Sequence, residues 1–125
     1  MRIIRLSGLP VSMPIAITER RVRDVTILEV KGRVVFYDGA AILRAHINDL
    51  VDQARLKMLL DLRDVTYMDS FGVGVIAAKY VSLRRKGGEL KLLKPSPRCQ
   101  QVLTISGLLR IFQSFESEDD ALRSF

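Results

Sequence analysis

One compact group of residues in this sequence has types and spacing that suit helix capping or close contact with another molecule. Asp69 and Ser70 follow an apolar run, and glycines stand at positions 72 and 74, within the segment LLDLRDVTYMDSFGVGV. The side chain of either Asp69 or Ser70 can cap a helix, because both accept hydrogen bonds from the free amides of a first turn. Glycine inside a helix costs about 1 kcal/mol relative to alanine. We therefore expect Gly72 and Gly74 to let another backbone or a ligand approach closely.

The helix that should follow this segment is apolar in every direction up to Lys79. Its apolar positions after the first glycine are Val73, Val75, Ile76, Ala77 and Ala78. A helix that lies on a sheet buries one face, so a second apolar face indicates burial against something else. Two interpretations remain open at this point: contact with a partner protein, or deep burial between neighbouring elements of the same chain.

Few other residues could support catalysis or metal binding. The chain has one cysteine, Cys99, and one histidine, His46, which excludes an internal disulfide and any cysteine-rich or histidine-rich metal site. No Gly-x-Ser-x-Gly motif is present, and no nucleophile–base pair can be identified. Asp61, Asp64 and Asp69 could bind a metal, but a strand end and a helix cap account for them. We therefore expect a protein that is not an enzyme, a buried or half-buried apolar Cys99 and a solvated His46.

Two known arrangements share part of the pattern and are set aside. The Gly-x-Gly-x-x-Ala run at 72–77 resembles a dinucleotide fingerprint, but Lys94 stands where the next strand should end in an acidic residue. A response-regulator receiver would use Asp61, yet it also needs an acidic pair after the first strand, where only Glu19 is found. The first two predicted strands form a hairpin, which that fold does not contain.

Periodicity and breaker residues predict an α/β domain with a mixed sheet of about five strands and about four helices, largely on one side of the sheet. The expected order is β-β-α-β-α-β-α-β-α. Strands are predicted at 15–20, 25–31, 58–62, 90–93 and 111–115. Helices are predicted at 39–55 and 70–86, then from a cap at Ser96 to Gly107, and from Ser117 onward. The nearly continuous apolar run at 58–62 is typical of a strand covered on both faces.

Composition and charge argue against a membrane-spanning protein and against a nucleic-acid-binding protein. The 125 residues are 48% apolar and 27% charged, enough for one core, and no apolar stretch is long enough to span a membrane. The net charge is +6, and between residues 70 and 115 eight basic residues face one acidic residue. The basic residues are not interleaved with exposed aromatics and no known nucleic-acid motif is present, so we expect a solvated surface and no nucleic-acid partner. The lone cysteine fits a cytoplasmic protein.

The first fourteen residues differ from the rest. Ser7, Gly8, Pro10 and Pro14 interrupt any regular element there. We therefore expect a flexible extension at 1–14, followed by a single domain at 15–125.

The segment DVTYMDSFGVGVIAAKYVSLRRKGGELKLLKPSP resembles the signature of STAS domains, in particular of bacterial anti-sigma-factor antagonists. The resemblance extends over residues 15–125. It includes the opening hairpin, the Asp-Ser-x-Gly-x-Gly run at 69–74, Gly87-Gly88 before a strand, and Ser106-Gly107-Leu108 after the third helix. It implies a STAS-like fold.

The resemblance also implies roles for individual residues. Ser70 matches the serine that an ATP-binding anti-sigma kinase phosphorylates, and Asp69 matches the aspartate of the motif. Asp38, before the first helix, matches a polar position near the kinase contact. Phe71 departs from the pattern, because a small hydroxyl residue is common there, and a bulky ring beside the acceptor could change the choice of partner.

The resemblance implies that the protein is a non-enzymatic switch in the control of transcription. The unphosphorylated protein would bind the anti-sigma kinase and release a sigma factor, and phosphorylation of Ser70 would end that binding. Gly72 and Gly74 would permit close approach of the partner, together with contacts from Asp38, Asp69 and Phe71. ATP would belong to the partner, so no cofactor is expected in this chain. The alternative is a STAS scaffold or accessory subunit of a signalling or transporter complex that is not phosphorylated.

Overall fold

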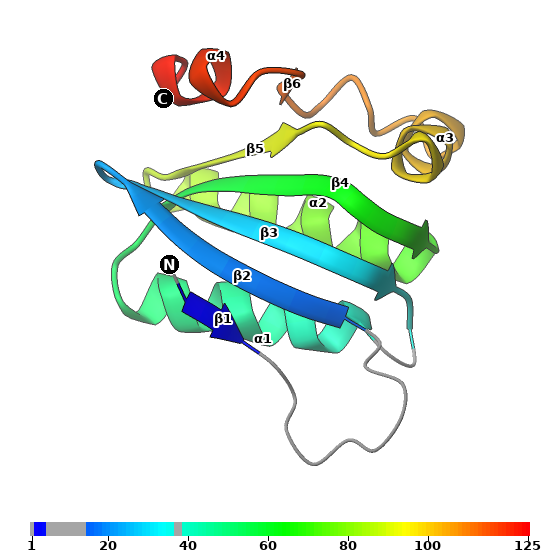
Figure 1. The fold of residues 1–125 in the computed structure, drawn as a ribbon, viewed down its shortest axis with the longest axis horizontal. Helices are drawn as coiled ribbons and strands as arrows, with labels where there is room; N and C mark the ends of the chain where they lie inside the picture. Colours follow the sequence, from blue (N-terminus) through cyan, green and yellow to red (C-terminus); the bar gives the residue numbers. More distant parts are fainter. Residues whose placement is uncertain (1, 5–14, 37–38) are drawn as a thin grey trace.

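The computed structural model describes residues 2–4, 15–36 and 39–125 and forms a mixed six-stranded sheet with four helices (Figure 1). The strands lie side by side in chain order, with β1–β2–β3 antiparallel and β3–β4–β5–β6 parallel. Their bounds are β1 Arg2–Ile4, β2 Ile15–Val22, β3 Val25–Val34, β4 Lys57–Met68, β5 Glu89–Leu93 and β6 Ser114–Phe115. The predicted mixed sheet and the order of its elements are confirmed.

Four helices connect or follow the parallel strands. They are α1 Gly39–Asp52, α2 Ser70–Arg85, α3 Pro97–Ile105 and α4 Glu118–Arg123. α1 and α2 lie next to each other on one face of the sheet, and α4 lies on the other (Figure 1). Among the helices of the described residues, none is long and apolar enough to cross a membrane.

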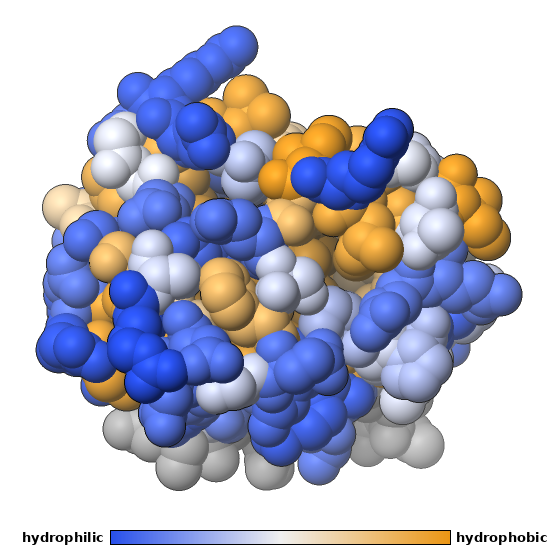
Figure 2. Space-filling view, turned by 90° about the horizontal axis from the view of Figure 1, so that it is seen from above, coloured by the Kyte–Doolittle hydropathy of each residue, from blue (hydrophilic) through white to orange (hydrophobic). Residues whose placement is uncertain are grey.

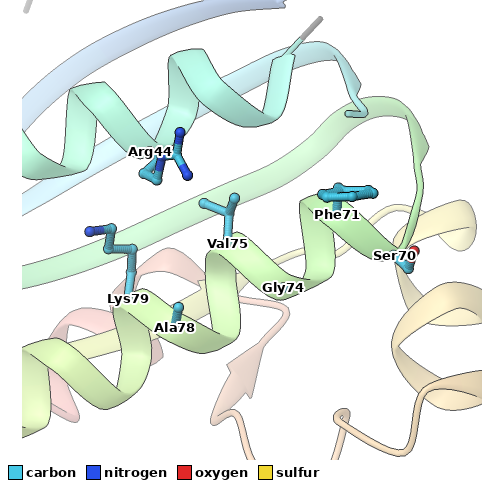
Figure 3. A pocket seen from close by; sticks show the side chains of 7 residues that line it. All are labelled: Arg44, Ser70, Phe71, Gly74, Val75, Ala78 and Lys79. Atoms are coloured by element: carbon cyan, nitrogen blue, oxygen red, sulfur yellow. The ribbon is translucent and has the colours of Figure 1, made fainter. Parts of the chain in front are cut away.

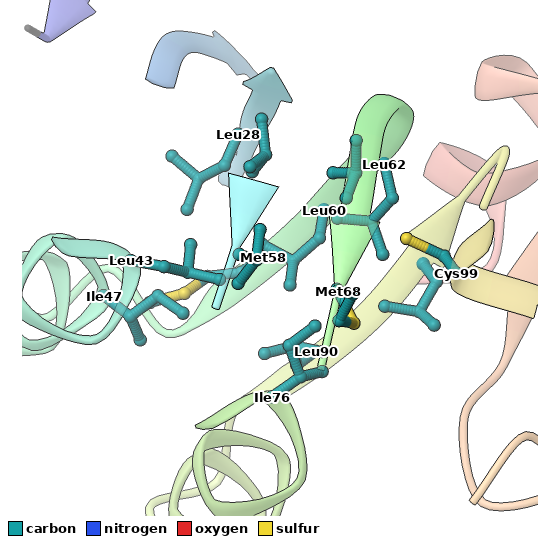
Figure 4. Close-up of a cluster of buried hydrophobic side chains, with 14 of the residues drawn as sticks. Leu28, Leu43, Ile47, Met58, Leu60, Leu62, Met68, Ile76, Leu90 and Cys99 are labelled. Atoms are coloured by element: carbon teal, nitrogen blue, oxygen red, sulfur yellow. The ribbon is translucent and has the colours of Figure 1, made fainter. Parts of the chain in front are cut away.

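Two apolar clusters pack against the opposite faces of the sheet. The larger one joins α1, α2 and α3 to the sheet through side chains such as Ile47, Ile76 and Cys99 (Figure 4). The smaller one places Ala121 and Leu122 of α4 against the other face. Successive residues of β4 enter the two clusters in turn, which explains the continuous apolar run that the sequence shows there.

The side of the molecule that carries α3 and α4 offers a mixed surface. Figure 2 looks onto it from above, and polar side chains there separate several apolar patches. Ile105 is the most exposed large apolar side chain within residues 15–36 and 39–125, at 79%.

Three details differ from the sequence-based predictions. A strand was not expected within the first fourteen residues, but β1 pairs with β2, with Ile3 opposite Thr18; residues 5–14, where flexibility was expected, lie outside the described part. β4 continues to Met68, because its parallel pairing with β3 continues through two shifts of register until Val34 lies beside Met68. The predicted edge strand at 111–115 is only two residues long, since β6 pairs with β5 at Ser114 and Phe115 alone.

The predicted solvation of His46 is wrong. Its ring is only 7% exposed, and its Nε2 lies 2.7 Å from Oε1 of Glu19 on β2. The guanidinium of Arg55 donates to the other oxygen of the same carboxylate. Glu19 occupies an inward position of β2, where His46 and Arg55 together satisfy its buried carboxylate. Cys99 is fully buried as predicted, and burial raises the pKa of its thiol.

Candidate functional site

Asp69 caps α2, and this leaves Ser70 exposed as the first residue of the helix. The Oδ1 atom of Asp69 accepts hydrogen bonds from the backbone amides of Phe71 and Gly72, both at 3.0 Å. Of the two candidate caps in the sequence, the structure therefore selects the aspartate. Among the residues that the structure describes, no hydrogen-bond partner contacts the Ser70 hydroxyl, which lies on the surface.

The same carboxylate joins the start of α2 to the end of β3. Oδ2 of Asp69 accepts a hydrogen bond of 3.1 Å from the amide of Phe36, just beyond β3. The backbone amide of Asp69 donates to the carbonyl oxygen of Val34. Adjacent parallel strands end at the same edge of a sheet, so the segments after β3 and β4 meet here. Asp38, the expected polar contact two residues further on, lies outside the described residues.

These bonds bring two aromatic rings together beside Ser70. The ring centroids of Phe36 and Phe71 are 4.2 Å apart, with an interplanar angle of 32°. Phe36 is 49% exposed and Phe71 is 54% exposed, so the pair offers apolar area on the surface. Phe71 was a candidate contact in the sequence, but Phe36 was missed, because no local pattern links residues 35 positions apart.

The two glycines of the motif have different surroundings. Gly72 is buried, and a Cβ atom added to it would lie 2.3 Å from the carbonyl oxygen of Val34. The backbone that approaches Gly72 closely is therefore β3 of the same chain, not that of a partner. Gly74 is exposed, and an added Cβ would meet nothing within 4 Å. Of these two predicted contact residues, only Gly74 lies on the open surface.

The apolar face of α2 divides between the core and a groove beside α1. Val73 and Ile76 belong to the larger cluster, and Val75 and Ala77 pack against it, so burial within the chain accounts for most of the pattern. Phe71 and Val75 also project from α2 toward α1 (Figure 3). There they line a hollow of about 390 Å³, whose other lining residues are Arg44, Ser70, Gly74, Ala78 and Lys79. Arg44 and Lys79 were not singled out in the sequence as site residues.

The remaining acidic candidates lie away from this site. Asp61 is buried in β4 and accepts a hydrogen bond from the backbone amide of Arg63, and burial raises the pKa of its carboxyl group. With Asp64 it lines a separate hollow over β2 and β3. Within the described ranges, no three histidine, cysteine or acidic side chains are placed to share a metal ion.

Comparisons with known proteins agree with this geometry. An anti-sigma F factor antagonist of Paenibacillus polymyxa is 28% identical over 101 residues, which cover 80% of this chain and 86% of the relative. An anti-sigma factor antagonist of Mycobacterium paratuberculosis has the same fold, with a TM-score of 0.79 and 23% identity over 93% of this chain and 97% of the other. The Bacillus cell fate determinant SpoIIAA in its phosphorylated form gives a TM-score of 0.68 and 23% identity, with 86% and 97% of the two chains covered. Residues 16–121 match the sequence family of the STAS domain, and the chain therefore belongs to that family.

Proposed function

We propose that this protein is an anti-sigma-factor antagonist whose unphosphorylated form binds an anti-sigma kinase and frees a sigma factor for transcription. The observation that carries the proposal is the position of Ser70, which is exposed at the start of α2 beside a carboxylate that already caps the helix. The name of the Paenibacillus relative supports the role, and the solved phosphorylated form of SpoIIAA supports a phosphate switch on this fold. The proposed role places the protein in the cytoplasm.

In the proposed reaction this chain supplies only the acceptor hydroxyl. The Ser70 oxygen attacks the γ-phosphorus of an ATP molecule that the kinase holds, and the bond to the leaving ADP breaks. The hydroxyl proton passes to a base of the kinase, because Asp69, the nearest carboxylate in sequence, is engaged by three backbone amides. ATP and magnesium therefore belong to the partner.

Phosphorylation would end binding without unfolding the protein. A phosphate adds a charge of roughly −1.5 to −2 at neutral pH. The amides of Phe71 and Gly72 already bind Asp69, so the new phosphate stands beside a carboxylate. It also stands next to the exposed rings of Phe36 and Phe71, where a partner would have to desolvate it. The fold is retained because the helix cap is Asp69 and not the modified serine.

The phosphorylation site is tested by incubating the protein with Mg-ATP and each purified anti-sigma kinase of its organism, followed by peptide mass spectrometry. We expect phosphate on Ser70 and not on Ser82, Ser96 or Ser106. Ser96 is buried and accepts a hydrogen bond from the Cys99 amide, while the Ser106 hydroxyl donates to a backbone carbonyl. Phosphate found only at the other serines would refute the assignment of Ser70.

A second function is favoured by one observation, the aromatic pair beside the acceptor. Phe36 and Phe71 form an apolar contact surface that needs no phosphate to bind a partner. A STAS scaffold or accessory subunit of a signalling or transporter complex would use this surface permanently. The same mass-spectrometry experiment distinguishes the two functions, because a scaffold that binds its partner remains unmodified in the presence of Mg-ATP.

A further inference from the structure

The hollow beside Ser70 is one part of a longer groove between α1 and α2. A second hollow of about 120 Å³ adjoins it and shares three of its lining residues, Arg44, Phe71 and Val75. The paired rings of Phe36 and Phe71 stand at one end, and a hydrogen bond from Lys79 Nζ to Asn48 Oδ1 bridges the helices at the other. Lys79 lies eight positions after Phe71 along α2, so the groove is about 12 Å long, a little over two helical turns.

Small and apolar side chains form the floor of this groove. Ala41 of α1 and Ala78 of α2 are exposed, and Val75 between them is half-buried. Gly74 adds open space, since nothing lies within 4 Å of the position its side chain would take. A floor of this kind can admit the larger apolar side chains of another molecule.

The side chains on the two sides of the groove are basic. Arg44 lies exposed on α1 and Lys79 lies on α2, and both line the larger hollow (Figure 3). No acidic residue occurs in α2. A second copy of this chain would bring arginine and lysine of two protomers together in a two-fold contact, so a self-association in this groove is disfavoured. The charge is complementary to an anionic partner with apolar side chains of its own.

We propose that the groove between α1 and α2 binds one amphipathic helix of the partner protein, with apolar side chains inward and acidic side chains on both flanks. Apolar residues at positions i, i+4 and i+7 of such a helix span the length of the groove. The acidic flanks pair with Arg44 and Lys79. This inference rests on the proposed function, because the bound helix belongs to the anti-sigma factor, which docks next to Ser70.

Two labelled peptides of about 14 residues test the groove directly, a length at which an amphipathic helix begins to form. Both carry leucine at i, i+4 and i+7, and they differ only in glutamate or lysine at the flanking positions. In fluorescence anisotropy titrations with the full chain, we expect the glutamate peptide to bind at least about tenfold more tightly. Its affinity should fall as NaCl is raised, because salt screens the pairs with Arg44 and Lys79. Equal affinity for the two peptides overturns the proposal.

Three variants locate the binding within the molecule. Arg44→Glu reverses one side of the groove and should invert the preference between the peptides. Ala78→Phe fills the floor and should abolish binding of both peptides. Arg85→Glu is the matched control, since it makes the same change of charge at an exposed position of α2 outside the lining residues and should bind like the wild type. An equal loss in Arg85→Glu and Arg44→Glu means non-specific attraction and overturns the groove assignment.

Binding and phosphorylation measurements with the anti-sigma kinase test the groove and the proposed function separately. If an anti-sigma kinase phosphorylates Ser70 of the wild type but binds Arg44→Glu and Ala78→Phe with unchanged affinity, the groove proposal is refuted and the proposed function stands. If the peptides are discriminated as expected but no anti-sigma kinase of the organism binds the protein, the groove stands and the proposed function is refuted. Circular dichroism melting of each variant verifies that a lost interaction is not a lost fold.

Discussion

Replacing each motif glycine by alanine should change stability in opposite directions, although the two positions are only two residues apart. At Gly72 the new methyl group would lie 2.3 Å from the Val34 carbonyl oxygen and 2.9 Å from Cγ of Met68. The carbonyl oxygen belongs to the backbone of Val34, the last residue of β3. It therefore cannot move without disturbing that strand. Overpacking of this kind costs about 1–3 kcal/mol, and the gain in helix propensity returns at most about 1 kcal/mol.

The matched substitution, Gly74→Ala, meets no atom within 4 Å. It should therefore stabilise the protein by about 0.5–1 kcal/mol through helix propensity alone. The propensity gain is the same in both variants, so their free energies of unfolding should differ by the overpacking cost alone, about 1–3 kcal/mol. For a chain of this size the difference corresponds to roughly 4–12 °C in melting temperature.

Urea unfolding, monitored by circular dichroism, measures this difference in the free energy of unfolding. Wild type and both variants should unfold with the same dependence on urea concentration, so that the shift of the midpoint reports stability alone. A Gly72→Ala protein as stable as the wild type would refute the assignment of Gly72 to packing against β3. A destabilised Gly74→Ala protein would show that this position is not open, and it would weaken the description of the groove.

Four further substitutions test the site and the packing of the C-terminal helix. Ser70→Ala should keep wild-type stability, because Asp69 caps the helix, and should bind the kinase permanently, whereas Ser70→Asp should bind more weakly; equal affinities of wild type and both variants in calorimetry would favour the scaffold function. Gly74→Arg should retain the fold by circular dichroism and lose kinase binding, and retained binding would place the interface elsewhere. The hydrogen bonds from Arg20 hold the pKa of the Glu118 carboxyl below its usual value, so its contribution to stability is present above the unfolded-state pKa and lost as the pH falls through the folded-state value. Glu118→Gln should therefore unfold more easily than the wild type at neutral pH and equally at strongly acidic pH, and a pH-independent difference would contradict this reasoning.

The sequence by itself determined the order of the elements from β2 onward and the point where most of them begin. Capping residues, prolines and glycines act within a few residues of themselves, so their effects can be predicted locally. Ser96 accepts the predicted capping hydrogen bond from the Cys99 amide, with Pro97 as the first helical residue. Gly87 and Gly107 adopt positive φ angles of 83° and 74° just after α2 and α3. For the same reason, the sequence predicts that either Asp69 or its neighbour Ser70 caps α2.

Only the tertiary structure decided how the site is assembled. Gly72 and Gly74 are indistinguishable in the sequence, but one faces the backbone of Val34 and the other faces solvent. The pairing of Phe36 with Phe71 depends on the parallel register of β3 and β4, which brings both strand ends to one edge of the sheet. Such contacts join segments more than 30 residues apart, and no local signal encodes them, because side-chain packing between elements is set only when the sheet and its helices come together.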